Sequence, residues 1–506
     1  MNQFKKYLIL AVLAILAAVG CQDYLEVPVN GIIIQDNYYE SDNDVNAAIL
    51  TAYDILTWNN NWDWGAPVFT KTLPSDEGTC GGASPSDQAG YNALDDYTYD
   101  SANDKISAYW NLNYFGVHRC NTVLDYVEGD TDFKAQAIAE AHGLRAYYYL
   151  ELVTLFGDLP ILTTTQIPVE EYSRPRSSVA EVYALIESDL NTAIAALPTK
   201  SEYGASDQFR ISKGTCQGLL AKAQVYQGKY SEALATVQEI VNSGEYALAE
   251  DFATIFKADG EFGSGSMFEA VFTSEVGYNW GTNPWDLGLP GGAWEANMHI
   301  QLMGPREGAF GDAAGLSLVQ GWGFNYPSEK LYNAYIAAGD EERRLATVIT
   351  EQEWIDGGGT ATGESHDYNG FLRTKYGSDP TESNDVSIQQ NYGTNWRLLR
   401  YADILLIGAE AAANAGDDAQ AQTYLNQVRT RAGLDDVTAT GDALMDAIMN
   451  ERFLELAFEG FRFHDLIRWG VAADNIEGFV EGKHNLFPIP NDEIVRAGDL
   501  TQNPGW

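Results

Sequence analysis

The stretch GLLAKAQVYQGKYSEALATVQEIVNSG, residues Gly218–Gly244, decides the fold. Its small and aromatic residues have the spacing of a tetratricopeptide helix pair: Ala223, Tyr226, Gly228, Tyr230 and Ala233. Alanine lets two helices approach closely, glycine allows the tight turn between them, and tyrosine fills the space that is left. The stretch therefore predicts one helix pair of a repeat scaffold.

Other segments extend this pattern. Tyr401–Gly433 repeats it more weakly, and Ile106–Phe156 has the length of a helix pair without the small residues. Apolar stripes and end signals predict single helices over Ser41–Thr57 and Ser178–Leu197. The chain is thus predicted to be all-α, with a tetratricopeptide-like helical scaffold.

A long irregular segment divides this scaffold. Residues 251–395 are rich in Gly, Trp, Asn and Tyr, with helical periodicity only near Ser328–Ala338, and Trp58–Asn103 is a shorter loop-rich stretch. Long irregular segments of folded proteins tend to carry binding groups. We therefore expect a helical region over 41–250, a loop-rich insertion over 251–395 as the ligand-binding face, and a helical region over 396–506.

The N-terminus has the features of an export signal. Two lysines precede the apolar run Tyr7–Val19, which is shorter than the roughly 20 residues that span a bilayer. Small residues lead from this run to Cys21, as in a bacterial lipoprotein. We predict a signal peptide over 1–20, lipidation of Cys21 and a tether over 21–40. The alternative is an ordinary secretory signal followed by a chance cysteine.

Composition excludes several classes of partner. Lys and Arg number 30 and Asp and Glu 72, which gives a formal charge of -42. Such a surface repels phosphate backbones, so nucleic acid is not an expected partner. It also disfavours a broad electrostatic dock on anionic lipid.

Cysteine and histidine patterns predict neither a metal site nor a cofactor. Cys80, Cys120 and Cys216 follow Cys21, and one bridge with one thiol or three buried thiols are both open. The histidines are scattered, without a metal-binding spacing. A structural calcium ion is left open.

Acidic residues recur every four positions near the C-terminus, at Glu451, Glu455 and Glu459, and are therefore expected on one face of a helix. Two acids so close could be a glycosidase pair. Other charged residues are interleaved with them: Arg452, Arg462, Asp465 and Arg468. Because mixed acids and guanidinium groups usually form ion networks, we favour a structural role.

Clusters of aromatic residues beside Asn and Asp are the candidate ligand platforms. A flat ring covers the apolar face of a sugar, and nearby polar groups bind its hydroxyls. The candidates are Trp62 and Trp64; Tyr97 and Tyr99; Tyr278, Trp280, Trp285 and Trp294; and Trp322 and Tyr326. For any single ring, packing in the core is the alternative role.

Motifs in order along the chain resemble the SusD/RagB family. They include an aromatic helix ending in Phe-Gly-Asp-Leu-Pro, an Arg-Tyr-Ala-Asp helix, and a closing Gln-Asn-Pro-Gly. The matching segments are Leu144–Pro160, Arg400–Ala411, Asn426–Leu434, Glu451–Gly470, Pro488–Pro490 and Gln502–Gly505.

The resemblance implies a SusD-like helical fold and a non-catalytic role. It implies a lipoprotein that faces outward from the outer membrane, binds a glycan or another oligomeric nutrient, and works with a SusC-like TonB-dependent transporter. Asp76 resembles a family position near the binding face. The alternatives are a lipid-anchored surface glycoside hydrolase and a structural lid on the transporter without ligand affinity. Whether the ligand is a sugar or a peptide stays open.

Overall fold

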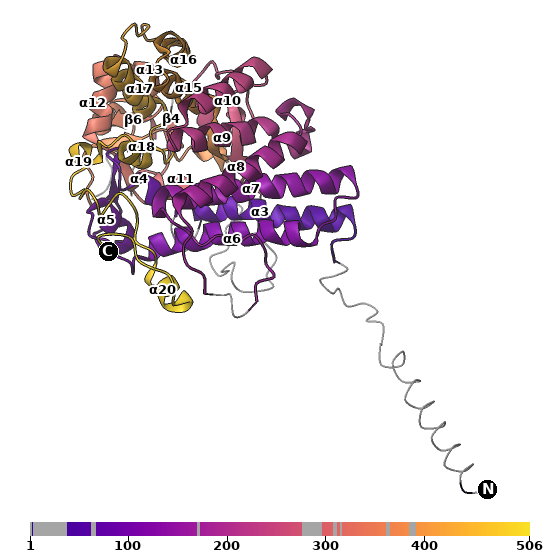
Figure 1. Cartoon of the computed structure of the whole chain (residues 1–506). Coiled ribbons are helices and arrows are strands. Elements are labelled where there is room, and N and C mark those ends of the chain that lie inside the picture. Colours follow the sequence, from indigo (N-terminus) through magenta and orange to yellow (C-terminus); the bar gives the residue numbers. More distant parts are fainter. Residues whose placement is uncertain are drawn as a thin grey trace.

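The computed structural model consists largely of helices (Figure 1). From residue 38 onward it describes residues 38–61, 67–168, 173–275, 296–306, 311–313, 316–360, 365–383 and 391–506. The predicted all-α class is confirmed. Within these residues, no helix is long and apolar enough to cross a membrane.

Long helices build the scaffold. They are α3 (Asp42–Asn61), α6 (Asp104–Tyr126), α7 (Asp132–Phe156), α8 (Val179–Ala196), α9 (Lys213–Tyr226), α10 (Tyr230–Ser243), α15 (Tyr401–Asn414), α16 (Asp418–Arg431) and α17 (Asp442–Glu455).

Shorter elements fill the remainder. The short helices are α4 (Phe69–Thr72), α5 (Ala89–Asp95), α11 (Met298–Met303), α12 (Glu329–Ala338), α13 (Glu341–Leu345), α14 (Glu351–Asp356), α18 (Arg462–Arg468), α19 (Ala472–Asn475) and α20 (Asn491–Ala497). The strands are β1 (Gly78–Gly81), β2 (Ser266–Ala270), β3 (Gly311–Ala313), β4 (Leu316–Leu318), β5 (Phe324–Pro327), β6 (Val348–Thr350), β7 (Phe371–Arg373) and β8 (Trp396–Arg400).

Polar caps fix where several helices begin. Ser178 and Glu181 form a reciprocal capping box at the start of α8, and the Thr131 side chain accepts the Lys134 N–H at the start of α7. These bonds satisfy backbone donors that have no partner within the helix. Gly244 ends α10 with a φ of 68°, a left-handed conformation that glycine adopts without steric cost.

Helix pairs form at the three places where the sequence predicts them. Helix α9 packs on α10, α6 on α7, and α15 on α16, which confirms the three predicted pairs. Close approach depends on small residues, because a Cβ added at Gly408 of α15 would lie 2.7 Å from Val237 Cγ1. Helix α10 packs directly on α15, so the stack is continuous in space across the segment that interrupts it in sequence.

Strands β2 and β8 lie side by side near the two ends of the interrupting segment. They pair antiparallel, which brings the two ends of the expected insertion together. Inside it, α12 confirms the helix predicted near Ser328–Ala338, and β6 pairs with β7. Strand β5 pairs with β1, so this part of the chain also joins the N-terminal region.

Two local predictions need correction. The stretch Trp58–Asn103 is less irregular than expected, because α3 continues to Asn61 and α4, β1 and α5 follow. Glu459 does not continue the helix of Glu451 and Glu455, since α17 ends at Glu455. Phe458 then turns the backbone with a φ of 64°, a conformation that is uncommon for a bulky residue.

Cysteine pairing is resolved in favour of the second alternative. The thiols of Cys80, Cys120 and Cys216 are all free and buried. Burial raises the pKa of each thiol above its ordinary value, so these cysteines behave as small apolar core residues.

Candidate functional site

The predicted aromatic clusters fall into two groups. One group lies outside the described residues, together with Cys21: Trp62, Trp64, Tyr278, Trp280, Trp285 and Trp294. The other group can be placed: Tyr97, Tyr99, Trp322 and Tyr326.

Tyr97 and Tyr99 are packing residues in this structure, with 8% and 3% of their surface exposed. The Tyr97 hydroxyl donates to the Pro74 carbonyl. The Tyr99 ring lies 5.0 Å from the ring of Trp506 and 5.5 Å from that of Phe487. Because protein covers both rings, their positions do not fit an exposed platform.

Trp322 keeps part of its surface accessible, whereas its predicted partner Tyr326 is only 1% exposed. The Tyr326 hydroxyl accepts a hydrogen bond from the Arg306 backbone N–H at 3.4 Å. The backbone N–H of Trp322 donates to the Gln301 carbonyl of α11. The backbone carbonyl of Trp322 accepts a hydrogen bond from the Arg306 side chain at 3.0 Å. Trp322 is therefore the placed candidate whose position best fits contact with a ligand.

The described ends of the Trp-rich segment 276–295 are anchored on one stretch of chain. Asn391 donates to the Ser274 carbonyl at 2.8 Å. Asn297 donates its N–H to the Tyr392 carbonyl at 2.7 Å. Helix α11 follows immediately and binds Trp322, so the same corner of the structure holds both Trp322 and Asn297, just after the end of this segment.

Asp76 is held by cations of the protein itself. It receives two hydrogen bonds from Arg462, at 2.7 and 2.9 Å, and pairs with Lys330 at 2.7 Å. Burial works to raise the pKa of Asp76, but these contacts with Arg462 and Lys330 hold it below its ordinary value. The carboxylate thus ties the segment before β1 to α18, and its oxygens are occupied.

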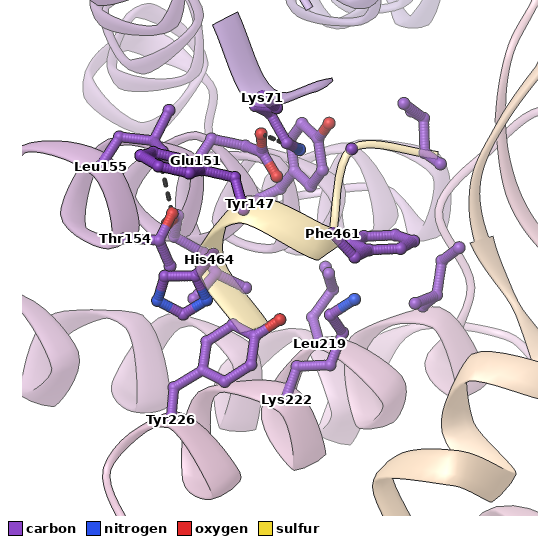
Figure 2. A pocket seen from close by; sticks show the side chains of 15 residues that line it. Lys71, Tyr147, Glu151, Thr154, Leu155, Leu219, Lys222, Tyr226, Phe461 and His464 are labelled. Carbon is purple, nitrogen blue, oxygen red and sulfur yellow. Dashed lines mark hydrogen bonds and ion pairs between the residues drawn. The ribbon is translucent and has the colours of Figure 1, made fainter. Parts of the chain in front are cut away.

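A small cavity with both apolar and charged lining residues lies between α7, α9 and the start of α18 (Figure 2). Lys71, Glu151 and Tyr147 lie on one side of it, and Lys222 and Tyr226 lie on the other. Its cations are already paired, Lys71 with Glu151 at 2.7 Å and Lys222 with Asp403 at 2.5 Å.

The size and chemistry of this pocket fit water. Its volume is about 30 Å³, whereas ligand pockets hold about 300 Å³ or more and one water needs about 10–15 Å³. Burial, with Arg468 nearby, lowers the pKa of His464 to about 3, so the imidazole is neutral. The pocket is too small for a sugar ring.

The C-terminal acids form the structural ion network that the sequence predicts. Glu455 is fully buried and contacts Arg343 at 3.0 Å, Arg400 at 2.8 Å and Arg431 at 2.5 Å. Burial works to raise the pKa of Glu455, but these guanidinium groups hold it well below its ordinary value. A carboxyl group that stays ionised and sealed cannot act as an acid on a glycan.

Sequence reasoning missed most partners in this network. The interleaved arginines bind other acids, since Arg452 pairs with Asp403 and Asp465, and Arg468 pairs with Glu410. Arg343 and Lys375, which neutralise Glu455 and Glu459, come from the interrupting segment. Arg400 was visible in its Arg-Tyr-Ala-Asp motif, but no local spacing connects it to residues more than fifty positions away.

Two family models match this chain. The model described as "SusD family" matches residues 291–485, and the model described as "Starch-binding associating with outer membrane" matches residues 75–226. Among curated proteins, SusD-like protein P2 of Formosa agariphila is 26% identical over 540 residues, covering 99% of this chain and 100% of that protein.

Solved structures share the architecture. A protein titled "Laminarin binding SusD-like protein" superimposes with a TM-score of 0.82 at 29% identity, covering 92% of this chain and 100% of the other. Surface glycan-binding protein A from Bacteroides thetaiotaomicron, in complex with laminarihexaose, gives a TM-score of 0.77 at 25% identity, covering 91% and 99%. The helical stack, the two family matches and these full-length similarities lead to one conclusion: the chain belongs to the SusD/RagB family.

Proposed function

We propose that this protein is a surface glycan-binding lipoprotein of the outer membrane, which captures an oligo- or polysaccharide and passes it to a SusC-like TonB-dependent transporter. It acts by binding and does not cleave its ligand. The observation that carries the proposal is the full-length similarity to the laminarin-binding SusD-like protein, at 29% identity. Similarity to the laminarihexaose complex supports the same class of ligand.

The anchor in this proposal is a lipid on Cys21. Residues 1–20 have the charge and length of an export signal, and small residues lead into the cysteine. Each buried CH₂ of an acyl chain contributes about 0.8 kcal/mol to membrane affinity, so several chains on one residue hold a folded domain firmly. One matching family is described as associating with the outer membrane, which agrees with this location.

The ligand face in this proposal is the corner that carries Trp322. The Trp-rich segment with Tyr278, Trp280, Trp285 and Trp294 leaves and re-enters the described structure beside α11, the helix that binds Trp322. Flat rings of this kind can cover the apolar faces of successive sugars. Weak contacts repeated along a polymer then add up to useful avidity.

Binding and cleavage can be separated in one experiment. The chain from Gln22 onward is titrated calorimetrically with laminarin and with a panel of other polysaccharides, and reducing ends are measured in the same samples. Binding without new reducing ends is the expected result. Release of new reducing ends would instead support the glycoside hydrolase alternative, and no binding to any glycan would support the structural lid.

The ligand face is tested with two variants. Changing Trp280, Trp285 and Trp294 together to Ala is expected to weaken binding at least about tenfold, since each ring contact contributes about 0.5–1.5 kcal/mol. Tyr335→Phe is a matched control at a fully buried ring, whose hydroxyl donates to the Leu454 carbonyl at 2.6 Å. This control should alter stability but not affinity. Equal loss of affinity in both variants would contradict the placement of the site.

The anchor is tested in cells that express the full chain. Labelled palmitate should enter the natural protein and not the Cys21→Ala variant, which should appear in the soluble fraction. Co-purification with a TonB-dependent barrel tests the transporter partnership. Label in the Cys21→Ala variant would contradict lipidation at Cys21. An unlabelled variant that stays in the membrane fraction would contradict the role of this lipid as the anchor.

A further inference from the structure

The distribution of positive charge constrains the chemistry of the ligand. Glycans that carry carboxylate or sulfate groups are normally recognised by Arg and Lys, because guanidinium and ammonium groups match these anions. Every Lys and Arg beyond Lys6 lies among the described residues. The cations that could meet such a ligand can therefore be followed one by one.

Most of these cations are already neutralised by acids of the protein. Three of them, Arg397, Arg400 and Arg431, line a cavity of about 320 Å³. Arg400 and Arg431 both bind Glu455, and Arg397 donates to the Asn395 and Lys257 carbonyls. Even here, where the fold gathers three guanidinium groups, their main contacts are internal.

Four cations outside the ion pairs also make internal contacts. Lys200 donates to the Gly263 and Ser266 carbonyls. Arg176 donates to Asn503 at 2.5 Å, and Arg373 is 2% exposed and lies over the Phe458 ring. The Lys483 ammonium lies 4.2 Å from the centre of the Trp506 ring.

The proposed ligand face itself is acidic. Residues 276–295 include Asp286 and Glu295 but no Lys or Arg. The cation bonded to Trp322 is Arg306, whose side chain is 19% exposed and lies 3.8 Å from the Asp87 carboxylate. An incoming anion at this face would compete with Asp87 for a single guanidinium group.

From this charge distribution we infer that the ligand is a glycan without negative charge, and that the protein discriminates against polysaccharides bearing sulfate or carboxylate groups. The inference rests on the proposed function and narrows it to neutral glycans. Neutral hydroxyls need only hydrogen bonds and ring contacts, which an acidic face with many oxygens can supply. An anionic polymer would meet like charge in a chain whose formal net charge is -42.

Matched derivatives of one polysaccharide test this inference. Laminarin, hydroxyethyl laminarin and sulfated laminarin are titrated into the chain from Gln22 onward, in about 0.01 M and about 1 M salt, where charges are screened beyond about 30 Å and about 3 Å. Hydroxyethyl groups add bulk without charge. Sulfated laminarin should bind at least about tenfold more weakly than the hydroxyethyl derivative at low salt, and high salt should narrow this difference.

A pair of variants locates the effect. Asp87→Asn removes the carboxylate beside Arg306, and should improve the binding of sulfated laminarin at low salt. Asp54→Asn is the matched control: it removes a carboxylate on α3 that lies 3.2 Å from Arg119. This variant should bind sulfated laminarin as the natural protein does.

Failure of the inference and failure of the proposed function give different results. Tighter binding of sulfated laminarin, alginate or chondroitin sulfate than of any neutral glycan, with affinity that falls as salt rises, would overturn the inference and leave glycan capture intact. Absence of binding to every neutral and anionic polysaccharide would overturn the proposed function itself.

Discussion

Replacing Glu455 by Gln tests the ion network in the C-terminal half of the protein. The Glu455 side chain is fully buried, and three guanidinium groups, from Arg343, Arg400 and Arg431, contact its two oxygens. Glutamine has nearly the same shape but no charge, and its NH₂ group points donors at the donors of the arginines. The substitution therefore leaves buried positive charge without its counter-ion.

The expected loss is large because the side chains of Glu455 and its three arginine partners are buried. Removing one partner of a buried ion pair typically costs about 3–5 kcal/mol, since the remaining charge is left desolvated. Glu455 joins residues from three separate parts of the chain, so its loss also releases contacts between them. We expect the free energy of unfolding to fall by about 3–5 kcal/mol.

Urea unfolding of the chain from Gln22 onward, followed by tryptophan fluorescence, measures this change. Glu187→Gln is the matched control, because Glu187 pairs with Lys229 at 2.5 Å while their side chains are 25% and 39% exposed. Exposed pairs of this kind contribute about 0–1 kcal/mol. Equal stability losses in the two variants would refute the reasoning that burial determines the contribution of the network.

Three further predictions follow from packing, ionisation and thiol burial. Gly408→Val is expected to destabilise the stack by about 1–3 kcal/mol through crowding against Val237. Gly204→Val is the control and should change stability little, because no atom lies within 4 Å of its added Cβ. A comparable loss of stability in both variants would contradict the crowding argument. The pKa of Glu455 is lowered in the folded state, so its stabilising effect is complete above the unfolded pKa of about 4.3 and is lost as pH falls below that value. The urea midpoint of the natural protein should therefore fall in this acidic range. The midpoint of the Glu455→Gln variant should fall by less. A thiol reagent should not label the native chain from Gln22 onward and should label three cysteines in urea; rapid native labelling would contradict the burial of Cys80, Cys120 and Cys216.

Local patterns predicted the helical scaffold well. Small residues at helical spacing over Gly218–Gly244 mark contacts that depend on near neighbours in sequence, and α9 and α10 form there as expected. Pairing of β2 with β8 could not be predicted in this way, because more than a hundred residues separate the two strands. The end of α17 at Glu455 was also missed, because the left-handed backbone that follows it belongs to Phe458, a residue type that rarely signals a turn.

The candidate site was harder to predict than the fold. Tyr97, Tyr99 and Trp322 look alike in sequence, as rings beside Asn and Asp, yet only Trp322 keeps appreciable exposure. An aromatic side chain suits both a core and a binding surface, so its type does not reveal which role it has. Asp76 shows the same limit, because its neutralising partner Arg462 is distant in sequence.

Placement of Arg343 and Lys375 has a consequence for chimeras between relatives. Both lie in the interrupting segment, and they supply positive charge to Glu455 and Glu459 beyond its end. Exchanging residues 251–395 as a block for an unrelated segment would leave these glutamates short of counter-ions. A specificity transplant should therefore move only the outer loops, and retain both cations as part of the recipient.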